Sequence, residues 1–245
     1  MSGNRFGRLQ LLYGSSGLDN LSQRSVAVFG IGGVGSYAVE GLVRGGVGQL
    51  TLVDFDRVDI SNLNRQVHAI DATVGLPKVE AMAARCRAIN PVANIVPIQA
   101  RFEAGNEEEL LAPGFDYVLD CIDLVTSKLQ LIESCLQRKI PIISSMGVAN
   151  KLDPTLIQVA DLAHTRKCRL ARIVRKELRR RNIHGGVQVV YSLEEFRSLP
   201  EGRREVAADE HYQARRAPLG SSSVIPPIFG LTMAGEVIRA LLEVN

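Results

Sequence analysis

The stretch Val26-Ala27-Val28-Phe29-Gly30-Ile31-Gly32-Gly33-Val34-Gly35-Ser36 decides the fold of this 245-residue chain. A short apolar strand runs directly into glycines with the spacing G-x-G-x-x-G, and the next apolar segment ends at an acid, Asp54. Glycines at this spacing let the backbone approach phosphate groups, and the helix that follows directs its N-terminus at them. The stretch therefore predicts a nucleotide site in a βα unit rather than a strand–helix turn without a ligand.

Strand and helix patterns alternate through the first 145 residues. We expect strands at 25–30, 50–54, 95–99, 116–120 and 141–145, and helices at 34–44, 78–89, 107–111 and 126–138. Repeated βα units predict a Rossmann-like, doubly wound, mainly parallel sheet with helices on both faces. Gly30, Asp54 and Asp120–Asp123 all fall at the carboxyl ends of strands, where ligands bind in such sheets.

The remainder of the chain is expected to extend the same domain. We divide the single domain, 1–245, into an N-terminal helical arm (1–24), a nucleotide-binding core (25–161), a basic helix with a mobile RNA-facing region (162–216) and a C-terminal helix (217–245). Further strands are predicted at 156–161 and 187–191. The helix pattern at 228–244 predicts that Leu231, Val237, Ile238, Leu241 and Leu242 are buried.

The basic segment, residues 166–181, has nine Lys and Arg residues against the one acid Glu177. Its net charge is thus +8 in a chain whose total is +3, which leaves −5 for the rest. Leu170, Ile173, Val174 and Leu178 recur at helical spacing and predict a packed face. The cationic side chains of such a helix repel one another at i, i+4 spacing. This repulsion favours a polyanion as partner over a merely solvated face. The residues expected to contact RNA are Arg169, Arg172, Lys176, Arg179 and Arg180.

Cysteine usage and hydropathy exclude several classes of protein. The four cysteines form no C-x-x-C pair, so neither zinc nor a disulfide framework is expected, and Cys168 is the one thiol expected to be exposed. The N-terminus lacks an apolar signal core, and the longest uncharged run, 217–235, contains prolines and serines and does not predict a membrane span. We expect a cytoplasmic protein without a membrane partner. For His68 we expect a hydrogen-bonded structural role.

The polar loop after Asp54 indicates which nucleotide chemistry follows. It contains Asn62 and Arg65, and Lys78 then opens a helix. A guanidinium and an ammonium at one crevice suit a triphosphate, whose charge must be offset as pyrophosphate leaves. Hydride transfer has no such need, so a nicotinamide dehydrogenase, with Asp54 on the ribose, is a less favoured alternative. A nucleotide-binding module without catalysis is another.

The motifs together resemble a known superfamily. The patterns G-x-G-G-V-G-S, D-x-D-x-V-x-x-S-N-x-N-R-Q, G-x-x-K-V and D-x-x-D are those of the ubiquitin-activating-enzyme-like (ThiF/MoeB/HesA) superfamily, whose members adenylate carboxylates with ATP. Within it the chain is most similar to the branch that dehydrates threonylcarbamoyladenosine in tRNA. That similarity rests on the segments 64–69 and 153–163, and on the basic helix with Val189-Val190-Tyr191-Ser192 after it.

The resemblance implies a role for each matched residue. Gly30, Gly32, Gly33 and Gly35 would admit ATP, Asp54 would bind the ribose, Asp56 would belong to the same site, and Asn62, Arg65 and Lys78 would meet the phosphates. Asp123 would hold Mg²⁺, although Leu124 stands where relatives often have Asn; Asp120 lies nearby. Arg8 would act across a homodimer. The catalytic set is thus Arg8, Arg65, Lys78 and Asp123.

The resemblance also implies partners: tRNA as substrate, and sulfur-relay proteins. The alternative within the superfamily is an adenylyltransferase that activates the C-terminus of a ubiquitin-like or sulfur-carrier protein. Ubiquitin-type activators need a thiol to receive the activated carboxylate, and the sulfur-carrier enzymes usually have paired C-x-x-C zinc ligands. An intramolecular cyclisation needs neither, and the basic helix argues against the protein-activating alternative, since nothing in that chemistry calls for a polyanion site.

Overall fold

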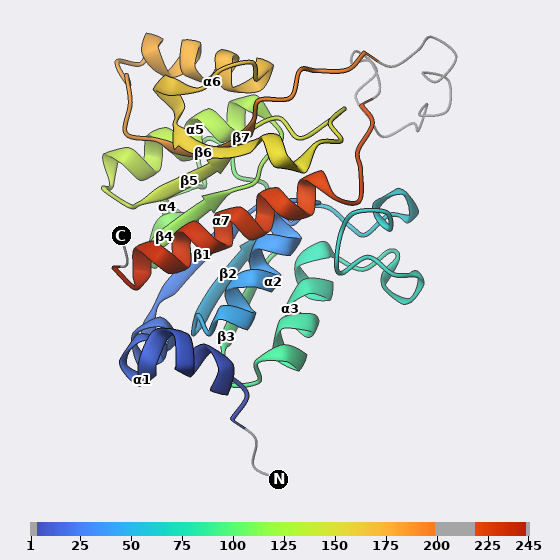
Figure 1. The fold of residues 1–245 in the computed structure, drawn as a ribbon, viewed down its shortest axis with the longest axis vertical. Coiled ribbons are helices and arrows are strands. Elements are labelled where there is room, and N and C mark those ends of the chain that lie inside the picture. The colour runs from blue at the N-terminus through green and yellow to red at the C-terminus, as the bar shows by residue number, and fades with distance from the viewer. Residues whose placement is uncertain (1–3, 199–218, 244–245) are drawn as a thin grey trace.

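A computed structural model describes residues 4–198 and 219–243 of the chain (Figure 1). The described strands are β1 (Ser25–Phe29), β2 (Gln49–Val53), β3 (Asn94–Ile98), β4 (Tyr117–Asp120), β5 (Ile142–Ser145), β6 (Ile157–Asp161) and β7 (Gln188–Ser192). The α-helices are α1 (Gly7–Gln23), α2 (Gly35–Gly45), α3 (Lys78–Ile89), α4 (Glu107–Leu111), α5 (Val125–Gln137), α6 (Arg169–Arg180) and α7 (Ile225–Leu241). Most predicted boundaries are met to within one or two residues.

The strands form one sheet in the order β3-β2-β1-β4-β5-β7-β6. Neighbouring strands from β3 through β7 are parallel, and among the described strands β6 alone is antiparallel, at the edge against β7. The order reverses between β1 and β4, which creates a crevice at their carboxyl ends. The prediction of a doubly wound, mainly parallel sheet is therefore confirmed.

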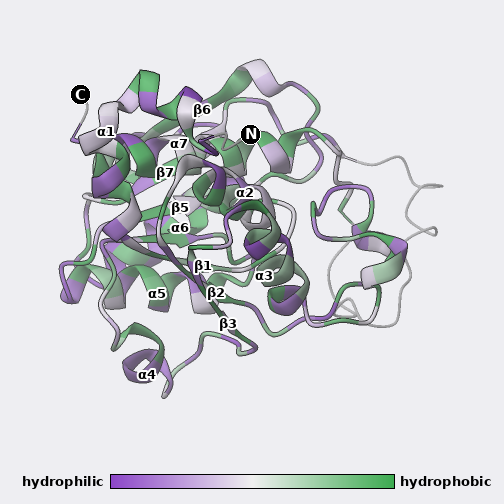
Figure 2. Ribbon diagram, turned by 90° about the horizontal axis from the view of Figure 1, so that it is seen from below, coloured by the Kyte–Doolittle hydropathy of each residue, from purple (hydrophilic) through white to green (hydrophobic). Residues whose placement is uncertain are grey.

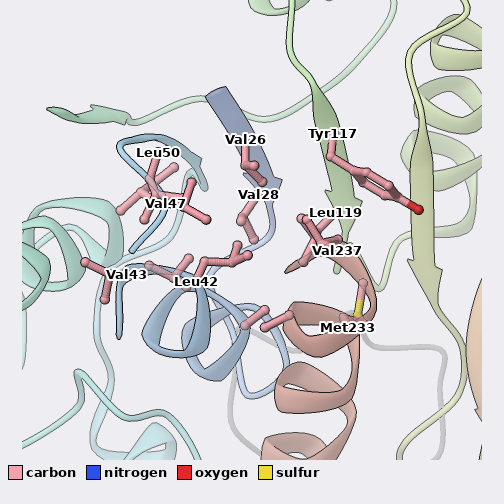
Figure 3. Packing of buried hydrophobic residues seen from close by; sticks show 14 of the residues in the cluster. Val26, Val28, Leu42, Val43, Val47, Leu50, Tyr117, Leu119, Met233 and Val237 are labelled. Carbon is pink, nitrogen blue, oxygen red and sulfur yellow. The ribbon is translucent and has the colours of Figure 1, made fainter. Parts of the chain in front are cut away.

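Helices cover both faces of the sheet because successive strand side chains point to opposite sides. Val26 and Val28 of β1 join a cluster with α2, α3 and α7, whereas Ala27 and Phe29 join a second cluster with α4, α5 and α6. Figure 3 shows the first cluster, in which Leu42 of α2 and Val237 of α7 approach the sheet from the same side. In Figure 2, α1 and α3 each carry both hydrophobic and hydrophilic residues, as half-buried surface helices do.

Helix α7 begins earlier than its sequence pattern predicts. Pro226 and Pro227 lie in its first turn. Proline is tolerated there because backbone N–H groups of the first turn have no helical acceptor, and because the fixed φ of proline suits the helix. Its buried face contains Phe229, Met233 and Val237, as well as the predicted Ile238 and Leu241. The prediction that Leu231 is buried is wrong. Leu231 is 48% exposed, because it lies two residues from Phe229 and Met233 and so points away from the face they share.

Helix α1 is bent at Gly14, which has φ +70° and ψ 171° within an otherwise helical run. Only glycine adopts this conformation readily. Leu11 and Leu12, just before the bend, are largely exposed. No helix in the described ranges is long and apolar enough to cross a membrane.

Candidate nucleotide site

The glycine loop lies in the crevice between β1 and β4, and its glycines differ in their surroundings. A Cβ on Gly30 would lie 2.8 Å from the backbone carbonyl of Cys121, and one on Gly35 would lie 1.8 Å from the carbonyl oxygen of Gly30. These two glycines therefore permit close backbone packing. A Cβ on Gly32 would meet no described atom within 4 Å, so Gly32 faces the open space that a ligand could enter.

Asp54, directly after β2, is buried beside this loop. Its carboxylate accepts hydrogen bonds from the backbone N–H of Ile31 (2.6 Å) and of Asp56 (2.8 Å). Burial raises the pKa of the Asp54 carboxyl, and the nearby Lys78 ammonium opposes that rise. Asp54 thus ties the glycine loop to the end of β2, and its contact with a ribose stays a prediction.

Lys78 and Asp56 form an ion pair of 2.8 Å between Nζ and Oδ2. The Lys78 side chain is nearly buried at the first residue of α3, and its backbone N–H also donates to the carbonyl oxygen of Asp56. Asp56 therefore positions the ammonium at the N-terminus of α3, where phosphate binding is favoured. The sequence grouped these two residues at one site but did not reveal that they pair.

The loop between β2 and α3 brings Arg65 over the glycines. A Cβ on Gly33 would lie 3.4 Å from Cγ of Arg65, so the arginine stem runs alongside the glycine loop. The guanidinium donates 2.8 Å hydrogen bonds to the carbonyl oxygen of Ser61 and to Oδ1 of Asn64. Asn62 is buried and closes the turn at Ile60–Asn62, where its Oδ1 accepts from the backbone N–H of Asp59. In this structure Asn62 shapes the loop that presents Arg65.

Asp120 and Asp123 have different environments at the end of β4. Asp120 is fully buried, and Oδ2 of its carboxylate accepts from Lys128 Nζ (2.7 Å) and Ser144 Oγ (2.5 Å). Lys128 is also fully buried and donates as well to Ser144 Oγ (3.2 Å) and the carbonyl oxygen of Ser145 (2.9 Å). With its charge neutralised in this way, Asp120 is unsuited to a metal.

Asp123, in contrast, is exposed and makes no hydrogen bond or ion pair within the described residues. A single free carboxylate beside a phosphate site suits Mg²⁺, which binds through one or two carboxylates, phosphates and water. The donor set therefore fits the predicted metal.

Sequence reasoning missed Lys128, although a signal was present. Lys128 occupies the buried stripe of α5 with Ile132 and Cys135, so it stands where an apolar residue belongs. A lysine there needs a buried acid as partner, and Asp120 was the acid available.

His68 lies beneath the phosphate loop with 3% of its surface exposed. The expected hydrogen-bonded role is wrong for its side chain, because neither ring nitrogen has a partner in the part of the chain described. Desolvation, reinforced by the cations of Lys78 and Arg85, lowers the pKa of His68 to about 4. The ring is therefore neutral at pH 7.

The cysteines do not form a reactive site in this structure. Cys168, expected to be exposed, is buried with 7% exposure, and its Sγ lies beside Gly147. Burial raises the pKa of Cys86 and of Cys135 to about 12 each. No group of three or more His, Cys, Asp or Glu side chains in residues 4–198 and 219–243 could hold a metal.

Helix α6 presents the predicted cationic face, with one change in the packed face. Ala171, Val174 and Leu178 are buried, but Ile173 is 46% exposed, contrary to the prediction. Successive residues of an α-helix are rotated by about 100°, so Ile173 points away from the stripe to which its neighbour Val174 belongs. Arg172, Lys176 and Arg179 are exposed on one stripe with Arg169 and Arg180. Cζ of Arg169 lies 4.3 Å from the centroid of the Phe196 ring, and Arg180 forms an ion pair with Glu177. Leu170 lies beside Gly147, so α6 begins near the carboxyl end of β5.

Arg8 is exposed in the first turn of α1, far from the glycine loop of its own chain. The start of this arm lines a hollow of about 390 Å³ together with Gly48 and Ala93, which precede β2 and β3. This is the amino-terminal edge of the sheet, whereas the glycine loop lies at the carboxyl-terminal edge. The structure thus brings Gly30–Gly35, Asp54, Asp56, Asn62, Arg65 and Lys78 together, with Asp123 beside them, and leaves Arg8 apart.

A doubly wound sheet with a glycine loop, a buried acid after β2, and an arginine and a lysine beside it defines a nucleotide-binding α/β protein of the adenylating type. The model of the ThiF family matches residues 6–245, and the chain belongs to this family.

Its relatives are similar over most of their length. The chain is 43% identical to tRNA threonylcarbamoyladenosine dehydratase of Bacillus subtilis (strain 168), over 98% of the chain and 95% of that protein. A crystal structure of the E. coli dehydratase TcdA in complex with ATP superposes with a TM-score of 0.86 at 34% identity, covering 98% of this chain and 94% of that one. Similarity to the molybdopterin-synthase adenylyltransferase of Salmonella typhimurium, 42% identity, covers 59% of the chain and 58% of that protein.

Proposed function

We propose that this protein is an ATP-dependent tRNA-modifying enzyme that dehydrates threonylcarbamoyladenosine in tRNA to its cyclic form. The observation that carries the proposal is the 43% identity to the Bacillus subtilis dehydratase along nearly the whole of both chains. The assembled glycine loop, the Lys78–Asp56 pair and Arg65 supply the site that such chemistry needs.

The reaction has two steps. In the first, a carboxylate oxygen of the substrate attacks the α-phosphorus of ATP. The bond between the α-phosphorus and the oxygen that bridges it to the β-phosphorus breaks, and pyrophosphate leaves with that oxygen. In the second, the carbamoyl group attacks the activated carbonyl carbon, the bond to the phosphate oxygen breaks, and AMP leaves with one oxygen of the original carboxylate. A proton is released, so the net change in the substrate is the loss of water.

The side chains of the site contribute mainly charge and position. The Lys78 ammonium, held by Asp56, and the Arg65 guanidinium offset the charge that develops on the departing pyrophosphate. Asp54 orients the ribose while it fixes the glycine loop, and Asn62 keeps the phosphate loop closed. Asp123 would hold Mg²⁺, which neutralises phosphate charge when bound. Positioning of this kind can account for much of the rate.

We further propose a homodimer in which Arg8 serves the neighbouring subunit. Support comes from the position of Arg8 at the edge of the sheet opposite its own glycine loop, with exposed Leu11 and Leu12 next to it. A two-fold dimer would place each arm on the other chain. The cytoplasmic location and the sulfur-relay partners stay predictions.

The alternative adenylyltransferase is supported by similarity over little more than half the chain. It does not explain the exposed cations Arg172, Lys176 and Arg179 on α6. We therefore favour RNA as the substrate.

Mass analysis of tRNA nucleosides tests the proposal. Incubation of tRNA containing threonylcarbamoyladenosine with the protein, ATP and Mg²⁺ should yield a nucleoside one water lighter, with one AMP formed per product. The Lys78→Ala variant is the control and should form neither. If the threonylcarbamoyladenosine is left unchanged while the C-terminus of a sulfur-carrier protein is adenylated with release of pyrophosphate, the proposal is overturned in favour of the adenylyltransferase.

A further inference from the structure

Arg65 is held by a neighbour whose own position depends on a distant part of the chain. The side-chain amide of Asn64 accepts from Arg65 Nη1 through Oδ1 (2.8 Å) and donates from Nδ2 to the carbonyl oxygen of Ser221 (3.1 Å). Both functions of the amide are therefore used, one toward the guanidinium and one toward the segment before α7. In Figure 1 that segment descends to α7 beside the loop that follows β2.

The segment before α7 is fixed in turn by Asn150, in the loop after β5. Asn150 bonds Gly220 twice: its backbone N–H donates to the Gly220 carbonyl (2.9 Å), and its Oδ1 accepts from the Gly220 N–H (2.6 Å). Its Nδ2 donates to the carbonyl oxygen of Arg197 at 2.8 Å. One buried side chain thus joins Gly220 to the stretch that follows β7.

Asn150 adopts a conformation that serves these bonds. Its φ is +56°, in the left-handed region that residues other than Gly, Asn and Asp rarely occupy. The two bonds to Gly220 favour this conformation, because the backbone N–H and the side chain of Asn150 must both face residue 220. A buried residue in this conformation, bonded through its backbone N–H and through both atoms of its side-chain amide, is typical of a positioning element.

We propose that Asn64 and Asn150 are positioning residues for the Arg65 guanidinium. Asn150 fixes Gly220 and Ser221, the carbonyl of Ser221 fixes the Asn64 amide, and that amide aims the guanidinium at the phosphates beyond the α-phosphate. The inference rests on the proposed function, because it takes Arg65 to be a phosphate ligand. Loss of either asparagine then weakens recognition of the triphosphate and leaves recognition of the adenosine and its first phosphate unchanged.

Calorimetric dissociation constants for ATP and for AMP test this. Asn64→Ala removes both bonds of the amide. Asn150→Gly removes the side-chain bonds while keeping a residue suited to positive φ, so backbone strain is not introduced. Each variant should weaken ATP binding about tenfold, the scale of one charge-assisted hydrogen bond, with AMP binding changed by less than about twofold. Asn182→Gly is the matched control: Asn182 also has positive φ, at the end of α6, and should bind both nucleotides as the unaltered protein does.

Arg65→Ala separates this inference from the proposed function. If Arg65→Ala leaves ATP affinity unchanged, Arg65 is not a phosphate ligand and both ideas are wrong at this residue. If Arg65→Ala weakens ATP while Asn64→Ala and Asn150→Gly do not, the positioning role alone is overturned. Equal weakening of ATP and AMP also overturns it, because a general disturbance of the site would act on both. Should Asn150→Gly fail to fold, the Asn64→Ala comparison decides.

Discussion

Gly32 and Gly35 lie three residues apart, and the structure predicts opposite consequences for the same substitution at each. Gly35→Ala would place a Cβ 1.8 Å from the Gly30 carbonyl oxygen, so we expect it to destabilise the fold by about 3 kcal/mol or more. Gly32→Ala should leave the free energy of unfolding almost unchanged and weaken ATP binding more than about tenfold, because its methyl group enters ligand space. Chemical denaturation and calorimetry measure the two effects. Normal ATP affinity in Gly32→Ala would mean that nucleotide does not approach this loop.

His68 predicts a specific acid sensitivity. Its pKa is about 4 in the folded chain against 6.5 unfolded, so between these values the unfolded state binds the extra proton. The free energy of unfolding should therefore be unaffected by His68 above pH 6.5 and fall by up to about 3 kcal/mol as the pH is lowered to 4.

The His68→Leu variant isolates this effect from the titration of carboxylates. It should lose that part of the pH dependence and be close to the unaltered protein in stability at pH 7, because the two ring nitrogens it removes have no partners. Parallel stability curves for the two proteins between pH 4 and 7 would contradict the assignment.

At the scale of elements, the buried Lys128–Asp120 pair joins α5, β4 and β5. Lys128→Met should destabilise the protein by about 3–5 kcal/mol, because it leaves the Asp120 carboxylate buried without a cation. The double variant Asp120→Asn, Lys128→Met removes both charges and should recover a large part of that loss. Ser144→Ala should cost about 1 kcal/mol. Denaturant unfolding measures all three, and a double variant as unstable as Lys128→Met would show that packing rather than charge is responsible.

Helix α6 predicts an electrostatic signature of RNA binding. Reversal of Arg172, Lys176 and Arg179 to Glu should weaken tRNA binding and lower the slope of log affinity against log salt by about 0.7–0.9 for each phosphate that the helix no longer neutralises. ATP affinity should not change, because the helix lies outside the glycine-loop site. Arg239→Glu, on α7 at the opposite face of the sheet, serves as the control. An unchanged slope in the triple variant would identify α6 as a solvated surface only.

Local patterns predicted the elements well, because strand alternation, the Gly-rich turn and the Asn90-Pro91 helix stop act over a few residues. The position of β6 at the antiparallel edge, outside β7, could not be predicted in this way, since pairing partners far apart in sequence leave no local periodicity. The same holds for the candidate site. The residues predicted around the glycine loop do lie together, but the Asp56–Lys78 pair, the Asp120–Lys128 pair and the Asn150 bonds depend on tertiary contacts.

At the scale of the whole molecule, Arg8 and the glycine loop lie at opposite edges of one sheet. If Arg8 serves a second copy, Arg8→Ala and Lys78→Ala should each be inactive alone and should complement each other when mixed. Half of the dimers in an equal mixture are hybrid and each has one intact site, so about one quarter of the activity should return. AMP formation measures this after subunit exchange has been verified with differently tagged chains. No recovery would mean that Arg8 acts within its own chain or has no part in catalysis.

The pairing of Asp161 with Gln188 has a consequence for how this protein could diversify. These residues face each other at the end of the β6–β7 ladder, so everything from Leu162 to Val187, α6 included, is the expanded loop of a single hairpin. Insertions and replacements inside such a loop leave the strand register intact on both sides. The exposed cations of the surface proposed to receive tRNA can thus change in number and charge without a shift of either strand, provided that Ala171, Val174 and Leu178 keep the buried face of α6 packed on the sheet.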